Sequence, residues 1–127
     1  MRVLKSKHFD KWLRNEKIDD LALKSAICEV VEGLVDGNLG GNVFKKRISR
    51  EGQGKRESYR TILAFKSDER MIFILGFAKK DKENITLQEK TALKRIAKDY
   101  LNTTDAKIDL LVKTKKLVEV NYDHRTK

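Results

Sequence analysis

Seven basic residues lie between positions 42 and 60, on both sides of a glycine-containing turn. They are Lys45, Lys46, Arg47, Arg50, Lys55, Arg56 and Arg60. Only Glu51 and Glu57 oppose them, so this stretch carries about half of the net charge of +10. Guanidinium and ammonium groups gathered in this way bind phosphate groups. The segment therefore predicts a phosphate-contacting surface, with nucleic acid as the first candidate partner and an acidic protein as the second.

Strand-like sequence on both sides of the turn decides which of these side chains can act together. Successive strand residues point to opposite faces of a sheet. In the first strand Phe44 and Ile48 mark the more apolar face, which we assign to the core. That assignment leaves Lys45 and Arg47 on the open face, where Arg60 of the next strand should join them.

Two further groups complete the predicted site. The third strand ends just before Lys79 and Lys80, and one of these lysines should reach the same face at the edge of the sheet. Tyr59 could stack on a base or donate a proton. A solvated, lysine-rich sheet face would look similar, but its solubility would not require arginines, which can hold phosphate with two hydrogen bonds.

The glycine turn is not a nucleotide-binding phosphate loop. That motif would need glycine at position 49 and serine or threonine at position 56, where this chain has Ser49 and Arg56. No pair of acids suggests a general acid and base. Catalysis would therefore depend on cationic side chains and perhaps on Tyr59.

The bulk composition narrows the classes of protein. The 127 residues suit one domain, covering 1–127. The single cysteine, Cys28, allows no internal disulfide, and no cysteine or histidine spacing suggests zinc, so we expect neither a metal nor a cofactor. No apolar run approaches membrane-span length, and the first residues do not resemble a signal peptide, so we expect a cytoplasmic protein with no membrane partner.

Apolar spacing and capping residues predict the helices. Residues 9–13 carry a short helical stripe, and residues 20–35 carry a longer one that Asp19 or Asp20 can cap. Thr86 and Glu89 form a capping-box pattern before a third helix, and residues 103–105 should begin a fourth.

The strands are predicted at 42–48, 58–66 and 70–77, with short strands at 2–6 and 117–120. Residues 71–77 are almost continuously apolar, which is typical of a central strand buried on both faces. Short connections favour an antiparallel meander. We expect an α+β fold with an antiparallel sheet of three to five strands and the N-terminal and C-terminal helices packed on one face.

The chain resembles the RelE/HigB-like toxins of bacterial type II toxin–antitoxin systems, of the RelE/ParE superfamily. The resemblance lies in a series of motifs that covers nearly the whole chain. They are Gly40–Ile48, Gly52–Lys55, Tyr59–Leu63, Gly76–Lys79, Asn84-Ile85, Ala92–Ala97 and Leu117–Val120. The chain departs from the nearest branch at Arg56-Glu57-Ser58, where serine and two glycines are usual.

The resemblance implies a ribosome-dependent endoribonuclease that cuts messenger RNA without a metal. In such enzymes the RNA 2′-hydroxyl attacks the adjacent phosphate and leaves a cyclic phosphate and a free 5′-hydroxyl. Arg47, Arg60 and Lys79 would stabilise charge, Lys45 or Lys55 would act as base or positioning group, and Tyr59 would stack on or orient a base. The remaining basic residues would bind RNA, namely Lys46, Arg50, Arg56 and Lys80.

The resemblance also implies a cognate antitoxin, often a helix-turn-helix protein, through which the toxin would reach operator DNA. The N-terminal helices and the basic face are its expected docking surfaces. Two alternatives stay open. Related ParE-type toxins inhibit DNA gyrase without catalysis, and a plain RNA-binding module would show the same charge pattern.

Overall fold

The computed structural model describes residues 1–49, 58–79, 81–82 and 84–122. Over these residues the chain forms four helices and six strands. In chain order they are β1 (Arg2–Ser6), α1 (Lys7–Asn15), α2 (Asp20–Val31), β2 (Gly37–Gly40), β3 (Val43–Ile48), β4 (Tyr59–Lys66), β5 (Arg70–Ala78), α3 (Leu87–Asn102), α4 (Asp105–Lys113) and β6 (Leu117–Val120). The α+β class is therefore confirmed.

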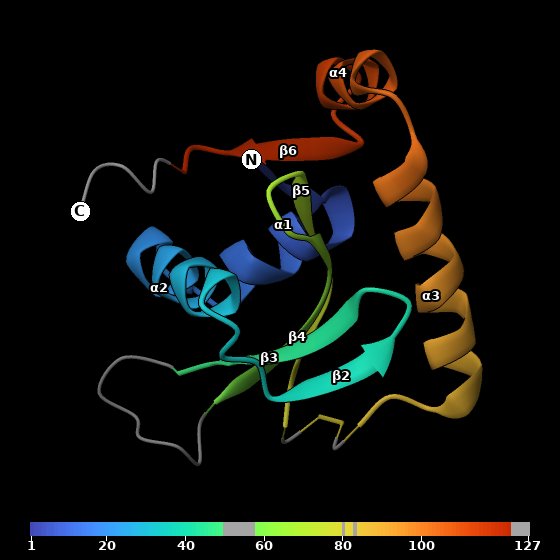
Figure 1. Ribbon diagram of the computed structural model, residues 1–127. Helices are drawn as coiled ribbons and strands as arrows, with labels where there is room; N and C mark the ends of the chain where they lie inside the picture. Colours follow the sequence, from blue (N-terminus) through green and yellow to red (C-terminus); the bar gives the residue numbers. More distant parts are fainter. Residues whose placement is uncertain (50–57, 80, 83, 123–127) are drawn as a thin grey trace.

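All six strands belong to one sheet in the order β2-β3-β4-β5-β1-β6 (Figure 1). The β3, β4 and β5 strands form the predicted antiparallel meander. The β1 strand pairs in parallel with β5 and antiparallel with β6, so the N-terminus and the C-terminal strand extend the meander. The sheet thus has six strands where three to five were predicted, and one of its pairings is parallel.

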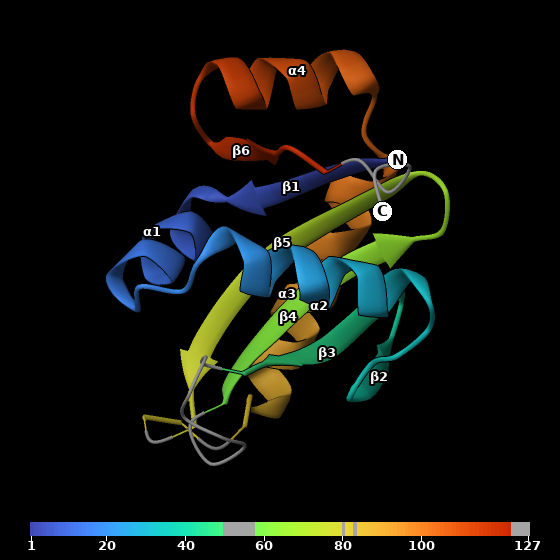
Figure 2. The ribbon, with the colours of Figure 1, turned by 90° about the vertical axis from the view of Figure 1, so that its left-hand side faces the viewer.

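The helices cover both faces of the sheet, which corrects the expectation of helices on one face. Figure 1 shows α1 and α2 on one side and α3 on the other. In Figure 2, α4 lies beyond β6, at the end of the sheet. The physical reason lies in the central strands, because β4 and β5 present buried apolar side chains in both directions and each face must be shielded from water.

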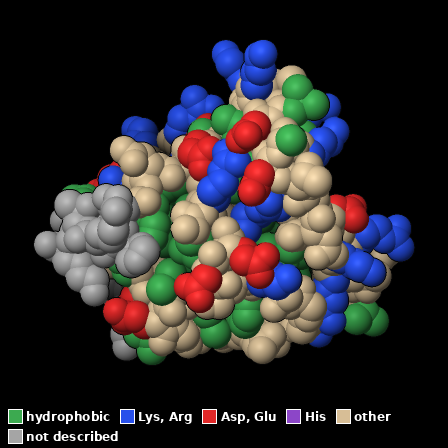
Figure 3. Space-filling view, turned by 45° about the horizontal axis from the view of Figure 1, so that its top comes forward, with side chains coloured by type: hydrophobic (Ala, Val, Ile, Leu, Met, Phe, Trp, Pro, Cys, Tyr) green, Lys and Arg blue, Asp and Glu red, His purple; other side chains and the backbone are tan. Residues whose placement is uncertain are grey.

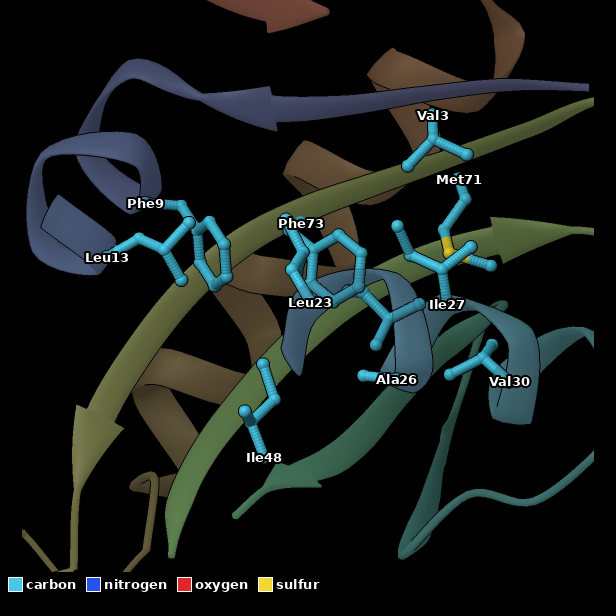
Figure 4. Close-up of a cluster of buried hydrophobic side chains, with 11 residues drawn as sticks. Val3, Phe9, Leu13, Leu23, Ala26, Ile27, Val30, Ile48, Met71 and Phe73 are labelled. Atoms are coloured by element: carbon cyan, nitrogen blue, oxygen red, sulfur yellow. The ribbon is translucent and has the colours of Figure 1, made fainter. Parts of the chain in front are cut away.

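Two apolar cores follow from this arrangement. The core under α1 and α2 includes Phe9, Leu23 and Ile27 from the helices and Met71 and Phe73 from β5 (Figure 4). The core under α3 and α4 is made by the residues that point to the opposite face. Its buried members are Leu4, Val43, Ile62, Ala64, Ile72, Ile74, Phe77, Leu93, Ala97, Ile108 and Leu117.

Local signals explain where the helices begin and end. Thr86 and Glu89 form the predicted capping box at the start of α3. The α2 helix ends at Val31, short of the predicted residue 35, because Gly33 adopts a φ of 88°. The amides of Gly33 and Leu34 donate back to Val30 and Glu29, which closes the last turn.

No helix in the described part of the chain is long and apolar enough to cross a membrane.

Candidate nucleic-acid interface

Arg47 and Arg60 lie directly opposite each other on neighbouring strands. They are Cα partners in the β3–β4 ladder, and Lys45 lies two residues along β3, opposite Ile62. All three belong to the sheet face that carries the α3 core, since Ile62 is a member of that core. Like charges placed directly opposite across a sheet destabilise it. This row of cations therefore has a cost in the folded protein that a bound anion would relieve.

Arg60 carries the clearest sign of an absent partner. Its Nη1 atom is buried and has no hydrogen-bond partner among the described residues. A buried donor without an acceptor costs the full loss of its hydration, and the cost is greater for a charged group. A phosphate oxygen is the kind of acceptor that a guanidinium fits best.

Arg47 and Lys45 are held by side chains from outside the meander. Asp36, which precedes β2, accepts the backbone N–H of Arg47 at 2.7 Å, and its other oxygen lies 3.8 Å from Arg47 Nε. Lys45 Nζ donates to Asn84 Oδ1 at 3.1 Å. Neither Asp36 nor Asn84 was predicted as part of the site. Asn84 belongs to one of the motifs of the family resemblance, but no role was predicted for it. Asp36 opens an Asp-Gly-Asn turn.

The segment that carries Asn84 is itself well anchored. Asn84 Oδ1 also accepts the amide of Ile85, at 2.9 Å, and the Thr86 cap follows at once. Glu89 hydrogen-bonds to Lys82, and this contact, together with the Thr86 backbone N–H, holds the pKa of the Glu89 carboxyl below its usual value. The connection from β5 to α3 is thus tied down at several points beside Lys45.

Lys79 directly follows β5 and is exposed. Arg60 pairs with Phe77, two residues before Lys79, so the end of β5 lies next to the Arg47–Arg60 row. The predicted third cation is therefore at the same end of the sheet as the two arginines.

Two predicted residues lie on the opposite face. Tyr59 is only 4% exposed, and its ring meets Trp12 edge-on with centroids 5.5 Å apart. Lys46 is 7% exposed, donates to the Leu34 carbonyl at 2.8 Å and lies 3.2 Å from Glu29. These two side chains therefore lie on the α1–α2 face, opposite the face of Lys45, Arg47 and Arg60. The face of the three cations was predicted to be open, but α3 covers part of it.

The other predicted residues lie outside the described ranges. They are Lys55, Arg50, Arg56 and Lys80.

Positive charge is not confined to this site. The face in Figure 3, turned toward the α4–β6 end, shows Lys and Arg side chains interspersed with Asp and Glu. Within the described ranges, no group of three or more His, Cys, Asp or Glu side chains could hold a metal ion. The β3–β4 row differs from the rest of the surface because Arg47 and Arg60 lie directly opposite each other, and because Arg60 Nη1 is buried with no partner among the described residues.

No curated protein matches the chain at a significant level. A family model does match, over residues 1–120, and it describes the RelE toxin of the RelE/RelB toxin–antitoxin system. The match covers nearly the whole chain, including every described helix and strand and all the cations of the site. The chain therefore belongs to the RelE toxin family, whose members are toxins that pair with an antitoxin.

Proposed function

We propose that this toxin is an endoribonuclease that cuts messenger RNA on the ribosome. The observation that carries the proposal is the buried Nη1 of Arg60, which has no hydrogen-bond partner among the described residues, at a strand position directly opposite Arg47. A positioned N–H donor that lacks an acceptor in the free protein is prepared for one that arrives with the substrate.

The chemistry that suits these groups is attack of an RNA 2′-hydroxyl on the adjacent phosphate. The phosphorane that forms carries an extra negative charge, which Arg60 and Arg47 would stabilise, with Lys79 as a third cation. The 2′-oxygen loses its proton to a base and bonds to phosphorus, while the bond to the 5′-oxygen breaks and that oxygen takes a proton from a general acid or from water. The products are a 2′,3′-cyclic phosphate and a 5′-hydroxyl. Lys45 would position the substrate or accept the 2′ proton.

We assign no contact with RNA to Tyr59 or Lys46, because each is buried against partners on the other face of the sheet. The partners in this proposal are the ribosome and its message as target, and an antitoxin of the helix-turn-helix kind as inhibitor.

The test compares wild-type protein with Arg60→Ala, Arg60→Lys and a matched arginine control, Arg14→Ala, in a purified translation system. Arg14 is on α1 and its side chain is 74% exposed. Primer extension should show cleavage within the message, and Arg60→Ala should slow it by roughly a hundredfold or more. Arg60→Lys should restore little, because one ammonium cannot replace a two-pronged guanidinium.

Thermal unfolding of the same variants separates function from fold. Because Arg60 Nη1 is buried with no partner in the described part of the chain, Arg60→Ala should unfold at the same temperature as wild type or higher. Intact message together with inhibited gyrase supercoiling would refute the proposal in favour of a gyrase poison. Tight RNA binding with no cleavage would refute it in favour of a binding module.

A further inference from the structure

We propose that Asn84 is a positioning residue that fixes the ammonium of Lys45 within the candidate site. The assignment rests on the proposed cleavage of RNA, because it gives Lys45 a defined place in that reaction. Asn84 lies in the connection between β5 and α3, far from Lys45 in sequence, and its Oδ1 accepts from Lys45 Nζ at 3.1 Å.

The orientation of the Asn84 amide is set by its neighbours. Its oxygen accepts from two donors, Lys45 Nζ and the amide of Ile85 at 2.9 Å. Rotating the amide by half a turn would place its NH₂ group against both donors, which is unfavourable. The oxygen is therefore held toward Lys45 by these two donors.

Lys45 needs such a holder for two reasons. Its four-carbon stem is flexible, and Arg47 and Arg60 in the same row repel its charge. The hydrogen bond to Asn84 offsets part of this repulsion and limits the positions that the ammonium can take. Misplacement of a reacting group by about 1 Å can cost roughly a hundredfold in rate.

An amide does this without removing charge. Asp36 beside Arg47 is a carboxylate, so it neutralises part of the charge that it orients. Asn84 is neutral, so it orients Lys45 without placing a negative charge beside the phosphate. A carboxylate at position 84 should therefore still orient Lys45 but weaken the binding of phosphate.

The test uses three variants of the full chain: Asn84→Ala, Asn84→Asp and, as control, Thr86→Ala. The control weakens the same helix start without touching Lys45. Two quantities are measured: the single-turnover cleavage rate on ribosomes at saturating protein, and the affinity of the protein for a 2′-O-methyl RNA trinucleotide, which cannot be cut.

Asn84→Ala should lower the saturated rate about tenfold and change the affinity little. Asn84→Asp keeps both hydrogen bonds, so the saturated rate should stay near wild type while the trinucleotide binds severalfold more weakly. A purely structural role would not separate the rate from the affinity in this way. Thr86→Ala should change neither by more than about twofold.

A double-mutant cycle then asks whether Asn84 acts through Lys45. The loss caused by Asn84→Ala should disappear when Lys45 is already alanine. Equal losses in both backgrounds, or an effect of Thr86→Ala as large as that of Asn84→Ala, would overturn the role of Asn84. Inactive wild-type protein would overturn the proposed function itself, which is a different result from additive losses in an active protein.

Discussion

Trp12 can pack closely against β5 only because residue 76 has no side chain. A Cβ atom at Gly76 would lie 2.8 Å from Cδ2 of Trp12 and closer still to Cε3 and Cζ3. The indole has little room to move away, since Phe9 and Tyr59 contact it with ring centroids 5.6 and 5.5 Å distant. Gly76 therefore sets how closely α1 approaches β5.

Replacing Gly76 with alanine should destabilise the protein by about 1–3 kcal/mol, because the added methyl overpacks the contact. Urea unfolding followed by Trp12 fluorescence measures the change, since this is the only tryptophan. Gly37→Ala is the matched control, because its Cβ would meet the nearest atom, Lys45 Cβ, at an ordinary 3.5 Å. In a Trp12→Leu background the cost should shrink, and an unchanged cost would show that the indole is not its source.

At the level of single residues, strand alternation predicted which cations share a face. It placed Lys45, Arg47 and Arg60 together and put Phe44 and Ile48 in the core, and the structure agrees. It could not predict Asn84 or Asp36 as their holders. Those contacts join segments far apart in sequence. The alternation of side chains within one strand does not indicate which distant loop will pack beside it.

Arg70 joins three elements at the other end of the sheet. It begins β5, and its Nη1 donates to the carbonyls of Tyr100 and Thr103, at 2.7 and 2.8 Å, where α3 ends. Its Nη2 donates to Asp105 at the start of α4, at 2.7 Å. The side chain is only 10% exposed, so these bonds are largely shielded from water. Arg70 therefore anchors the turn that sends α4 across the end of the sheet.

Removing this anchor should loosen α4 and β6 before the meander. Arg70→Ala leaves two helix-end carbonyls without their donor and should cost roughly 2–3 kcal/mol. Hydrogen exchange should show protection falling in α4 and β6, with much smaller changes in β3 and β4. Arg95→Ala, at an exposed position of α3, is the control. An equal loss of protection in every strand would contradict a local role for Arg70.

The elements themselves were largely predictable, whereas their arrangement was not. Caps at Asp19 and Thr86 marked two helix starts, and the strands of the meander were placed to within a residue or two. The β2 strand was missed because its residues, Gly-Asn-Leu-Gly, lack alternation of apolar side chains. The prediction that all helices cover one face of the sheet was also wrong. The apolar stripe of a helix does not indicate which face of a sheet it packs against. The continuous apolar run of β5 was the available signal that both faces are covered.

The whole molecule carries its net charge of +10 over many surfaces. Lysines at the α4–β6 end, including Lys113 and Lys116, are exposed, so an anion in solution can reach them. They could attract RNA from a distance, but long-range attraction is screened within about 10 Å at ordinary salt. A site in contact with phosphates differs, because each contact releases a counterion and leaves a measurable dependence on salt.

This difference makes it possible to test whether RNA binding depends on where the positive charge lies or only on the net charge. Two double variants each remove two positive charges, but from different places in the fold (Figure 1). One is Arg47→Ala/Arg60→Ala, in β3 and β4, and the other is Lys113→Ala/Lys116→Ala, at the α4–β6 end. Affinity for a single-stranded RNA oligonucleotide is measured across a range of salt concentrations. The site variant should reduce the slope of log affinity against log salt by roughly 1.4, at about 0.7 for each lost phosphate contact. The remote variant should keep the wild-type slope. Equal reductions in both variants would mean that RNA responds to net charge alone, and the β3–β4 row would then have no special role in binding.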